Sequence, residues 1–79
     1  MFHRITLITP NANNHTIALT YDDGLTVSVD FTDILERGIM TALKPPEVFN
    51  SVQIGSRGRS IIWREFDIDF CADSLRNKR

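Results

Sequence analysis

The sequence has a single cysteine, no long apolar run and almost no excess of charge of either sign. One cysteine, Cys71, excludes an internal disulfide. No apolar run is longer than three residues, as in Ile61–Trp63, whereas a membrane-spanning helix needs about 20. The net charge of −1 argues against a general electrostatic affinity for nucleic acid. We therefore expect a soluble, cytoplasmic protein without a secretory leader, with no membrane contact and no reliance on nucleic acid as a partner.

Signatures of catalysis and of metal binding are also missing. No serine has a Gly-x-Ser-x-Gly context, and the sequence does not indicate a residue that would act as the base for a nucleophile. His3 and His15 have no cysteine or carboxylate at the spacing of a metal site. The Asp22-Asp23-Gly24 segment lacks the other ligand positions of a calcium loop, and the Asp67/Asp69 pair lacks a third ligand. We therefore expect no enzymatic activity, no metal, no cofactor and no small-molecule substrate.

The clearest pattern that is present runs from Thr16 to Phe31. Apolar and polar residues alternate along 17–21 and again along 25–31, and Asp22-Asp23-Gly24 separates the two runs. Period-two alternation on both sides of an Asp-Gly pair is typical of a β-hairpin with one apolar and one polar face. This hairpin is the predicted base on which the rest of the chain packs.

An additional strand is predicted before the hairpin, over residues 2–9. In this strand Ile5 and Leu7 would share one face, and Ile8 would lie on the other. Residues 10–14, which contain a proline and three asparagines, would form the connecting turn. The three strands together would make an antiparallel meander.

Helical spacing replaces alternation after the hairpin. Apolar residues at i, i+3 and i+4 over 31–35, followed by Gly38, predict a helix of about two turns. Residues 39–43 have no clear period and are expected to be a connector. Pro45-Pro46 predicts the start of a second short helix, which ends near residue 50.

Strand patterns return in the last third of the chain. The predicted strands are 52–54, 60–63 and 65–70, with a turn over 55–58 and a final helical turn near 72–75. Cys71 follows an alternating apolar run and is expected to be buried. Trp63, Phe66 and Phe70 are expected to be core residues rather than interface anchors.

This order of elements predicts an α+β fold. We expect a mostly antiparallel sheet, built from the N-terminal meander plus the C-terminal strands, with two short helices between them. We expect the 79 residues to form one small domain over 1–79. The basic residues 76–79 are expected to be a frayed tail.

Three stretches of the chain carry a family resemblance. They are Leu19–Gly24 running into Val29–Phe31, the central Leu43–Val52, and Ile62-Trp63 with Phe66–Ile68. In order and spacing they resemble a small bacterial family known as domain of unknown function 2442, over about residues 4–75. The resemblance implies an α+β fold and no known catalytic activity. It also implies a genomic-neighbour partner, because some members are encoded beside a small toxin-like protein.

Charged residues are unevenly distributed and supply the candidate contact surfaces. The acidic candidates lie in the first half of the chain: Asp22, Asp23, Asp30, Asp33 and Glu36. The basic candidates lie in the second half: Arg57, Arg59 and Arg64. A guanidinium cluster could clasp carboxylates or phosphates, and an acidic rim could face a basic partner. The competing interpretation of both groups is ordinary solvated surface charge.

These observations favour a non-enzymatic regulator or inhibitor that docks on a protein partner, antitoxin-like or otherwise. An alternative is a phage-type inhibitor, such as an anti-CRISPR protein, whose acidic residues occlude a nucleic-acid-binding surface. A second alternative is weak nucleic-acid binding through Arg57, Arg59 and Arg64, which predicts a steep loss of binding with salt. The oligomeric state does not follow from the sequence.

Overall fold

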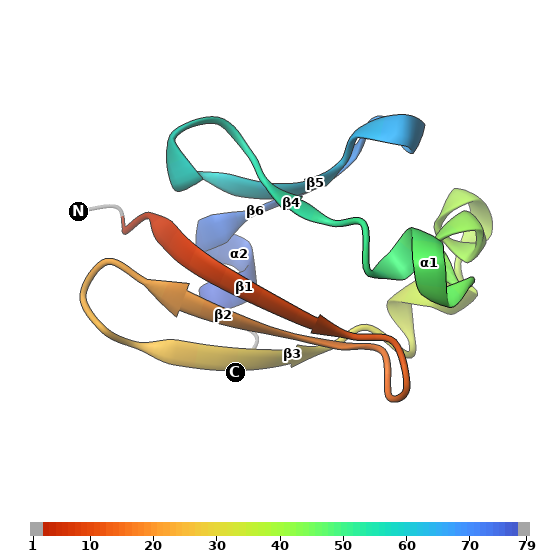
Figure 1. The fold of residues 1–79 in the computed structure, drawn as a ribbon, viewed down its shortest axis with the longest axis horizontal. Helices are drawn as coiled ribbons and strands as arrows, with labels where there is room; N and C mark the ends of the chain where they lie inside the picture. Colours follow the sequence, from red (N-terminus) through yellow and green to blue (C-terminus); the bar gives the residue numbers. More distant parts are fainter. Residues whose placement is uncertain (1–2, 78–79) are drawn as a thin grey trace.

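A computed structural model describes residues 3–77 and contains two three-stranded antiparallel sheets (Figure 1). The first sheet is the meander β1 (Ile5–Asn11), β2 (Thr16–Tyr21) and β3 (Thr26–Asp30), in that spatial order. The second sheet has the order β4 (Gln53–Ile54), β5 (Ser60–Trp63) and β6 (Ile68–Cys71). The expected α+β fold with mostly antiparallel strands is confirmed.

Short helical segments connect and flank the strands. Along the chain, β3 is followed by the 3₁₀ helices η1 (Ile34–Glu36) and η2 (Gly38–Leu43) and by the α-helix α1 (Pro46–Phe49), which precede β4. In the second half of the chain, η3 (Ser56–Gly58) connects β4 to β5, η4 (Arg64–Phe66) connects β5 to β6, and α2 (Ala72–Arg76) follows β6. No helix within residues 3–77 is long and apolar enough to cross a membrane.

The first strand differs from its prediction in position and in the direction of its side chains. It begins at Ile5 and extends through Asn11, so that two residues of the expected turn belong to the strand. A β-bulge between Ile5 and Leu7 shifts the register, since Ile5 lies opposite Tyr21 and Leu7 lies opposite Thr20. The bulge reverses the alternation. Ile5 is therefore buried and Leu7 is 58% exposed, and the expectation that they share a face is wrong.

The expected two-turn helix after the hairpin is also wrong. The chain makes the single 3₁₀ turn η1 and then a second 3₁₀ helix, η2, through the segment expected to be a connector. Gly38 begins η2 with a left-handed backbone (φ 46°), which separates the two helices. Phe31 and Leu35 still reach the core, so the apolar spacing predicted burial correctly at these two positions although it predicted the wrong helix type.

The last predicted strand begins three residues late. Arg64–Phe66 forms η4, which ends at Asp67 with a left-handed backbone (φ 55°), and β6 starts only at Ile68. Asp67 and Asp69 therefore do not alternate along one strand. Cys71 is exposed rather than buried, because along β6 it lies on the same side as exposed Asp69, opposite buried Ile68.

Aromatic rings join the two halves of the core. Phe31, directly after β3, packs edge-on against Trp63 of β5 and Phe70 of β6, at centroid distances of 6.1 and 5.3 Å. Phe49 of α1 lies 6.0 Å from Trp63, whose Nε1–H donates to the Phe49 carbonyl oxygen at 3.1 Å. The two sheets also approach closely at backbone level, where a Cβ on Gly58 would lie 2.7 Å from the Ile5 oxygen.

Candidate functional site

The eight predicted contact residues lie in three separate places. Asp22 and Asp23 occupy the turn between β2 and β3, and Asp30, Asp33 and Glu36 lie at the other end of β3 and in η1. The three arginines lie in and around η3 and η4 of the second sheet. Because most of β3 lies between Asp23 and Asp30, the two acidic groups do not form one continuous rim.

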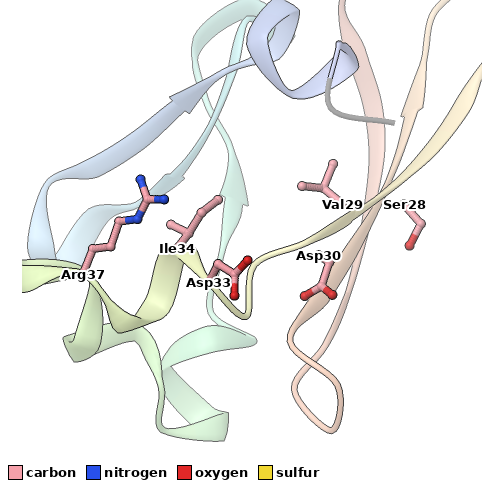
Figure 2. Close-up of a pocket in the computed structure, with 6 residues that line it drawn as sticks. All are labelled: Ser28, Val29, Asp30, Asp33, Ile34 and Arg37. Carbon is pink, nitrogen blue, oxygen red and sulfur yellow. The ribbon is translucent and has the colours of Figure 1, made fainter.

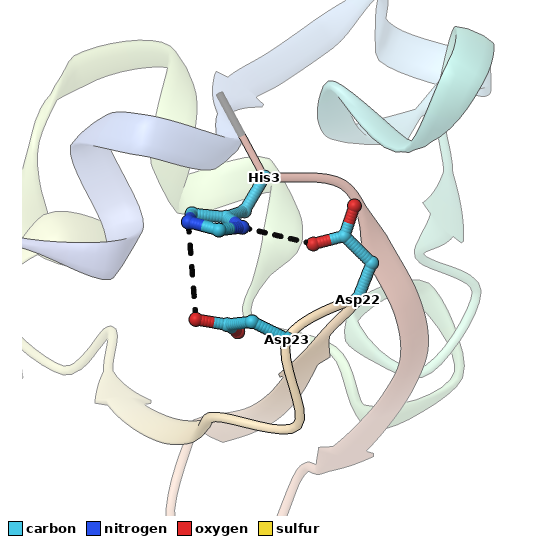
Figure 3. Close-up of side chains that lie close together, drawn as sticks. All are labelled: His3, Asp22 and Asp23. Atoms are coloured by element: carbon cyan, nitrogen blue, oxygen red, sulfur yellow. Dashed lines mark hydrogen bonds and ion pairs between the residues drawn. The ribbon is translucent and has the colours of Figure 1, made fainter. Parts of the chain in front are cut away.

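The turn between β2 and β3 gathers side chains that are distant in sequence (Figure 3). His3 Nδ1 lies 3.0 Å from Asp22 Oδ1, and His3 Nε2 lies 3.8 Å from Asp23 Oδ2. Arg76 of α2 donates to both carboxylate oxygens of Asp23, at 3.2 and 2.6 Å. The Arg76 guanidinium also lies 4.8 Å from the centroid of the Tyr21 ring. Arg76 therefore belongs to the folded domain, whereas residues 78–79 of the expected frayed tail lie outside the described residues.

Hydrogen bonds at this turn favour charged side chains. The hydrogen bond from Arg76 lowers the pKa of Asp23 to about 2, and the hydrogen bond with His3 lowers the pKa of Asp22. The hydrogen bond with Asp23 in turn raises the pKa of Arg76. Both carboxylates are therefore ionised throughout the neutral range, and the turn is a network of opposite charges.

The same turn offers the only metal-like donor set found within residues 3–77. His3, Asp22 and Asp23 each present one potential ligand atom, and these atoms lie within 4.8 Å of one another. One imidazole and two carboxylates suit several divalent metals. However, Asp23 Oδ2 already lies 2.6 Å from Arg76 Nη2, so a cation there would compete with a bound guanidinium. We interpret this group as a structural salt-bridge network.

The three arginines do not converge on one point. Arg59 donates to the carbonyl oxygen of His3 and, at 2.7 Å, to Asp73 Oδ2. Arg64 Nε donates to Gln53 Oε1 at 2.8 Å. Arg57 is exposed in η3, with a left-handed backbone at φ 59°. Two of the three guanidinium groups are thus engaged within the domain, in different directions, and they do not make the cluster that the sequence indicated.

An open hollow of about 360 Å³ lies beside the C-terminal part of β3 (Figure 2). Its lining comes from β3 and the η1 region: Ser28, Val29, Asp30, Asp33, Ile34 and Arg37. Figure 2 shows the carboxylate of Asp33 on the side of its segment that faces Asp30. We call β3 and this hollow together the β3 groove. It contains two of the predicted acidic contact residues and one arginine that the prediction omitted.

The charged side chains of the β3 groove are less engaged within the described residues than those of the turn. Asp30 Oδ1 accepts hydrogen bonds from the Thr32 hydroxyl and backbone N–H, at 2.6 and 2.8 Å, and these lower the pKa of Asp30. Asp33 makes no capping hydrogen bond to η1. Within residues 3–77, neither aspartate nor Arg37 takes part in a salt bridge. By contrast, Glu36 is paired with Lys44 at 2.9 Å.

Sequence reasoning missed the contribution of His3 and of Arg76 to the turn, because those contacts join opposite ends of the chain. It also did not single out β3 as the edge strand of the meander. The alternation of Thr26–Asp30, which places Ser28 on the polar face, and the change to helical spacing after it were the available signals.

Comparisons with known proteins give a family. Neither the search of curated proteins nor the search of solved structures found a match. A family model described as "protein of unknown function (DUF2442)" matches residues 8–79. This match covers most of the chain, including the second sheet, the β3 groove and both aspartates of the charged turn, whereas His3 and residues 5–7 of β1 precede it. The protein therefore belongs to the DUF2442 family.

Proposed function

We propose that this protein is a non-enzymatic regulator that docks on a partner protein through the β3 groove. The observation that carries the proposal is the pair Asp30 and Asp33, two exposed carboxylates that border an open hollow and have no salt-bridge partner within residues 3–77. The charges at the turn are already satisfied internally by His3 and Arg76. Of the two groups of acidic contact residues predicted from the sequence, the one in the β3 groove is therefore more able to gain energy from a basic partner.

The burial pattern supports docking rather than catalysis. No charged side chain within residues 3–77 is buried, and the described carboxylates with shifted pKa values are held by hydrogen bonds at the surface. General acid–base catalysis usually relies on burial or like-charge pairing to move a pKa toward neutrality. Here the three aspartate pKa values move away from neutrality, which suits permanent negative charges that attract a cationic surface.

A narrower form of the proposal concerns the class of partner. A basic surface that meets Asp30 and Asp33 could belong to a toxin-like neighbour or to a protein that binds nucleic acid. In the second case the docked domain would occlude the nucleic-acid site, as an anti-CRISPR protein does. The two cases differ in one observable, because only the second predicts that added nucleic acid competes with docking.

Affinity capture with matched charge variants tests the proposal. The wild type, Asp33→Lys and Asp69→Lys would be immobilised and exposed to lysate of the native host, and captured proteins would be identified by mass spectrometry. Asp69 is an exposed carboxylate of β6 outside the β3 groove and serves as the matched control. We expect a stoichiometric partner that is retained by Asp69→Lys and lost by Asp33→Lys. A partner that is insensitive to Asp33→Lys, or no partner at all, would contradict the proposal.

A further inference from the structure

The hydrogen-bond pattern of the hairpin determines which backbone groups of β3 face outward. Phe31 N–H donates to the His15 oxygen at 2.8 Å, and Tyr21 N–H donates to the Leu25 oxygen at 2.9 Å. In an antiparallel pair, hydrogen-bonded positions alternate with non-hydrogen-bonded positions. The β3 residues bonded to β2 are therefore the odd-numbered ones, 25 to 31. The N–H and C=O groups of the even-numbered residues point away from β2: Thr26, Ser28 and Asp30.

These outward groups form an open sheet edge. β3 is the last strand in the order β1-β2-β3, and its even-numbered residues are all exposed. Figure 1 shows β3 along the lower margin of the fold, on the side away from the second sheet. Sheet edges are commonly blunted by proline, lysine or a bulge. β3 has none of these and contains a single charged residue, Asp30 at its end, whereas β1, at the opposite edge, has a bulge near Leu7 and Pro10 within the strand.

The hollow lies directly beside this edge, because residues of β3 form part of its lining. An added strand would place alternate side chains over the apolar side of the hollow, where Ile34 is half-buried, and the others beside Ser28 and Asp30 on the polar face. A volume of about 360 Å³ is at the small end of the range for ligand pockets. It is suited to one or two side chains of an extended segment.

We propose that β3 binds an extended segment of the partner protein by β-strand addition. The backbone of Thr26, Ser28 and Asp30 would pair with the segment, and a lysine or arginine of the segment would meet Asp30 and Asp33. This inference rests on the proposed docking function and gives the chemistry of the partner, an extended chain that alternates apolar and polar residues and has at least one basic side chain. Strand addition obtains affinity from main-chain hydrogen bonds and specificity from alternate side chains.

The charges favour such a partner over a second copy of this chain. The β3 sequence Thr26–Asp30 contains no cation. Pairing two copies through β3 would add a second Asp30 to the edge without an opposing positive charge from the strand. Like charges brought together at an interface oppose association. A foreign segment whose basic side chain meets Asp30 avoids this repulsion between two copies of Asp30.

A peptide library selected against the immobilised protein tests the proposal without knowledge of the natural partner. The probe is a phage-displayed library of random linear peptides. We expect enrichment of proline-free sequences with alternating β-branched residues and at least one lysine or arginine. Failure to enrich any peptide, or enrichment of acidic or proline-rich ones, would overturn the proposal.

Two variants at one position separate strand addition from simple charge attraction. Ser28→Pro removes the outward N–H, while the inward bonds of Val27 and Val29 remain possible, and proline is tolerated on edge strands. Ser28→Ala removes only the hydroxyl and is the matched control. We expect the selected peptides to bind Ser28→Pro about tenfold more weakly than Ser28→Ala, or worse, because only the alanine variant keeps the outward N–H. Equal binding to all three proteins would overturn the proposal.

Amide hydrogen exchange gives a readout that does not depend on the folding of the proline variant. In the free wild-type protein, we expect the amides of Thr26 and Ser28 to exchange quickly and those of Val27 and Val29 slowly. The selected peptide should slow exchange at Thr26 and Ser28. Unchanged exchange at both positions in the peptide complex would overturn strand addition.

The outcomes distinguish this inference from the proposed function. A lysate partner that depends on Asp33 but not on the Ser28 N–H would leave docking in place and overturn strand addition. Sedimentation of the wild type alone tests the remaining possibility, that a second copy of this chain pairs with β3. A dimer that Ser28→Pro converts to a monomer would show that β3 pairs with a second copy. This result would overturn the proposal that β3 binds a segment of another protein.

Discussion

Arg76 and Asp23 are 53 positions apart, yet the guanidinium of one donates to both carboxylate oxygens of the other, at 3.2 and 2.6 Å. The same guanidinium lies 4.8 Å from the centroid of the Tyr21 ring, and the Tyr21 hydroxyl donates to the Ala72 oxygen at 2.6 Å. The last helix is thereby attached to the hairpin turn by an ion pair, a cation–π contact and a buried hydrogen bond. This attachment positions α2 against the meander, and it makes a prediction for acid stability.

Asp23→Asn should reduce the loss of stability in acid. The folded pKa of Asp23 is about 2, below its usual 3.8, so its contribution is complete above about pH 4 and is lost as pH falls through about 2. Asp22 and Asp30 have pKa values shifted in the same direction, so some acid dependence should remain. Melting temperatures between pH 5 and pH 2 measure the effect. The Asp23→Asn variant should melt at a lower temperature at pH 5 and have a flatter profile.

Asp69→Asn is the control for this measurement, because Asp69 is an exposed β6 residue that takes no part in the ion pair between Asp23 and Arg76. Its profile should match that of the wild type. If Asp23→Asn and the wild type lost stability in parallel between pH 4 and pH 2, the link between the Arg76 ion pair and acid stability would be wrong.

Trp63→Phe should destabilise the domain more than a conservative aromatic exchange normally does. Trp63 is 1% exposed and donates to the Phe49 oxygen at 3.1 Å. Phenylalanine removes the donor and leaves a buried carbonyl without this partner, which costs about 1–3 kcal/mol, and the smaller ring adds a cavity term. Urea unfolding followed by circular dichroism would measure the change. Phe66→Leu, at a half-buried position, should cost less, and an equal cost would contradict the argument.

Gly58→Ala and Gly24→Ala form a matched pair at positive φ. Both glycines have left-handed backbones, at φ 70° and 88°, so alanine is strained at either position by about 1–2 kcal/mol. Only at Gly58 would the new Cβ also lie 2.7 Å from the Ile5 oxygen and 2.9 Å from Arg4 Cβ. We expect Gly58→Ala to lower the free energy of unfolding clearly more than Gly24→Ala. Similar losses would show that the two sheets can separate locally at little cost.

Divalent metal ions should not stabilise the protein through the charged turn. His3, Asp22 and Asp23 provide donor atoms, but the Arg76 guanidinium already occupies Asp23. Melting curves with and without zinc or manganese should therefore coincide for the wild type. Arg76→Ala removes the competing cation and is the informative comparison. A metal-dependent rise in melting temperature in the wild type, abolished by His3→Ala, would show that the turn is a metal site.

Local pattern was enough to predict the hairpin and the fold class. The alternation over 16–31 and the Asp-Gly turn need only neighbouring residues to be interpreted, and the structure pairs Thr20 with Thr26 as such a hairpin requires. Helix type was not predictable in the same way. A short apolar repeat of i, i+3, i+4 suits an α-helix and a 3₁₀ turn alike, and the left-handed Gly38 interrupts the segment after η1.

The candidate site was partly predictable, and the reason lies in the range of the contacts. Asp30 and Asp33 are close in sequence, so their shared position at the end of β3 followed from the local pattern. The engagement of Arg59 by Asp73 and the His3 oxygen did not, because it depends on how the second sheet packs against the N-terminal segment. The β1 bulge, which turned Leu7 outward, likewise depends on the pairing of β1 with β2 rather than on either strand alone.

The unpaired edge of β3 also has a consequence for handling the protein. An edge that accepts one extended chain accepts others, so misfolded or neighbouring copies can nucleate aggregates there when the natural occupant is missing. Asp30 is the charged residue of that strand and would act as a gatekeeper against such stacking. Neutralising it should lower solubility at high concentration even where the folded state is unharmed.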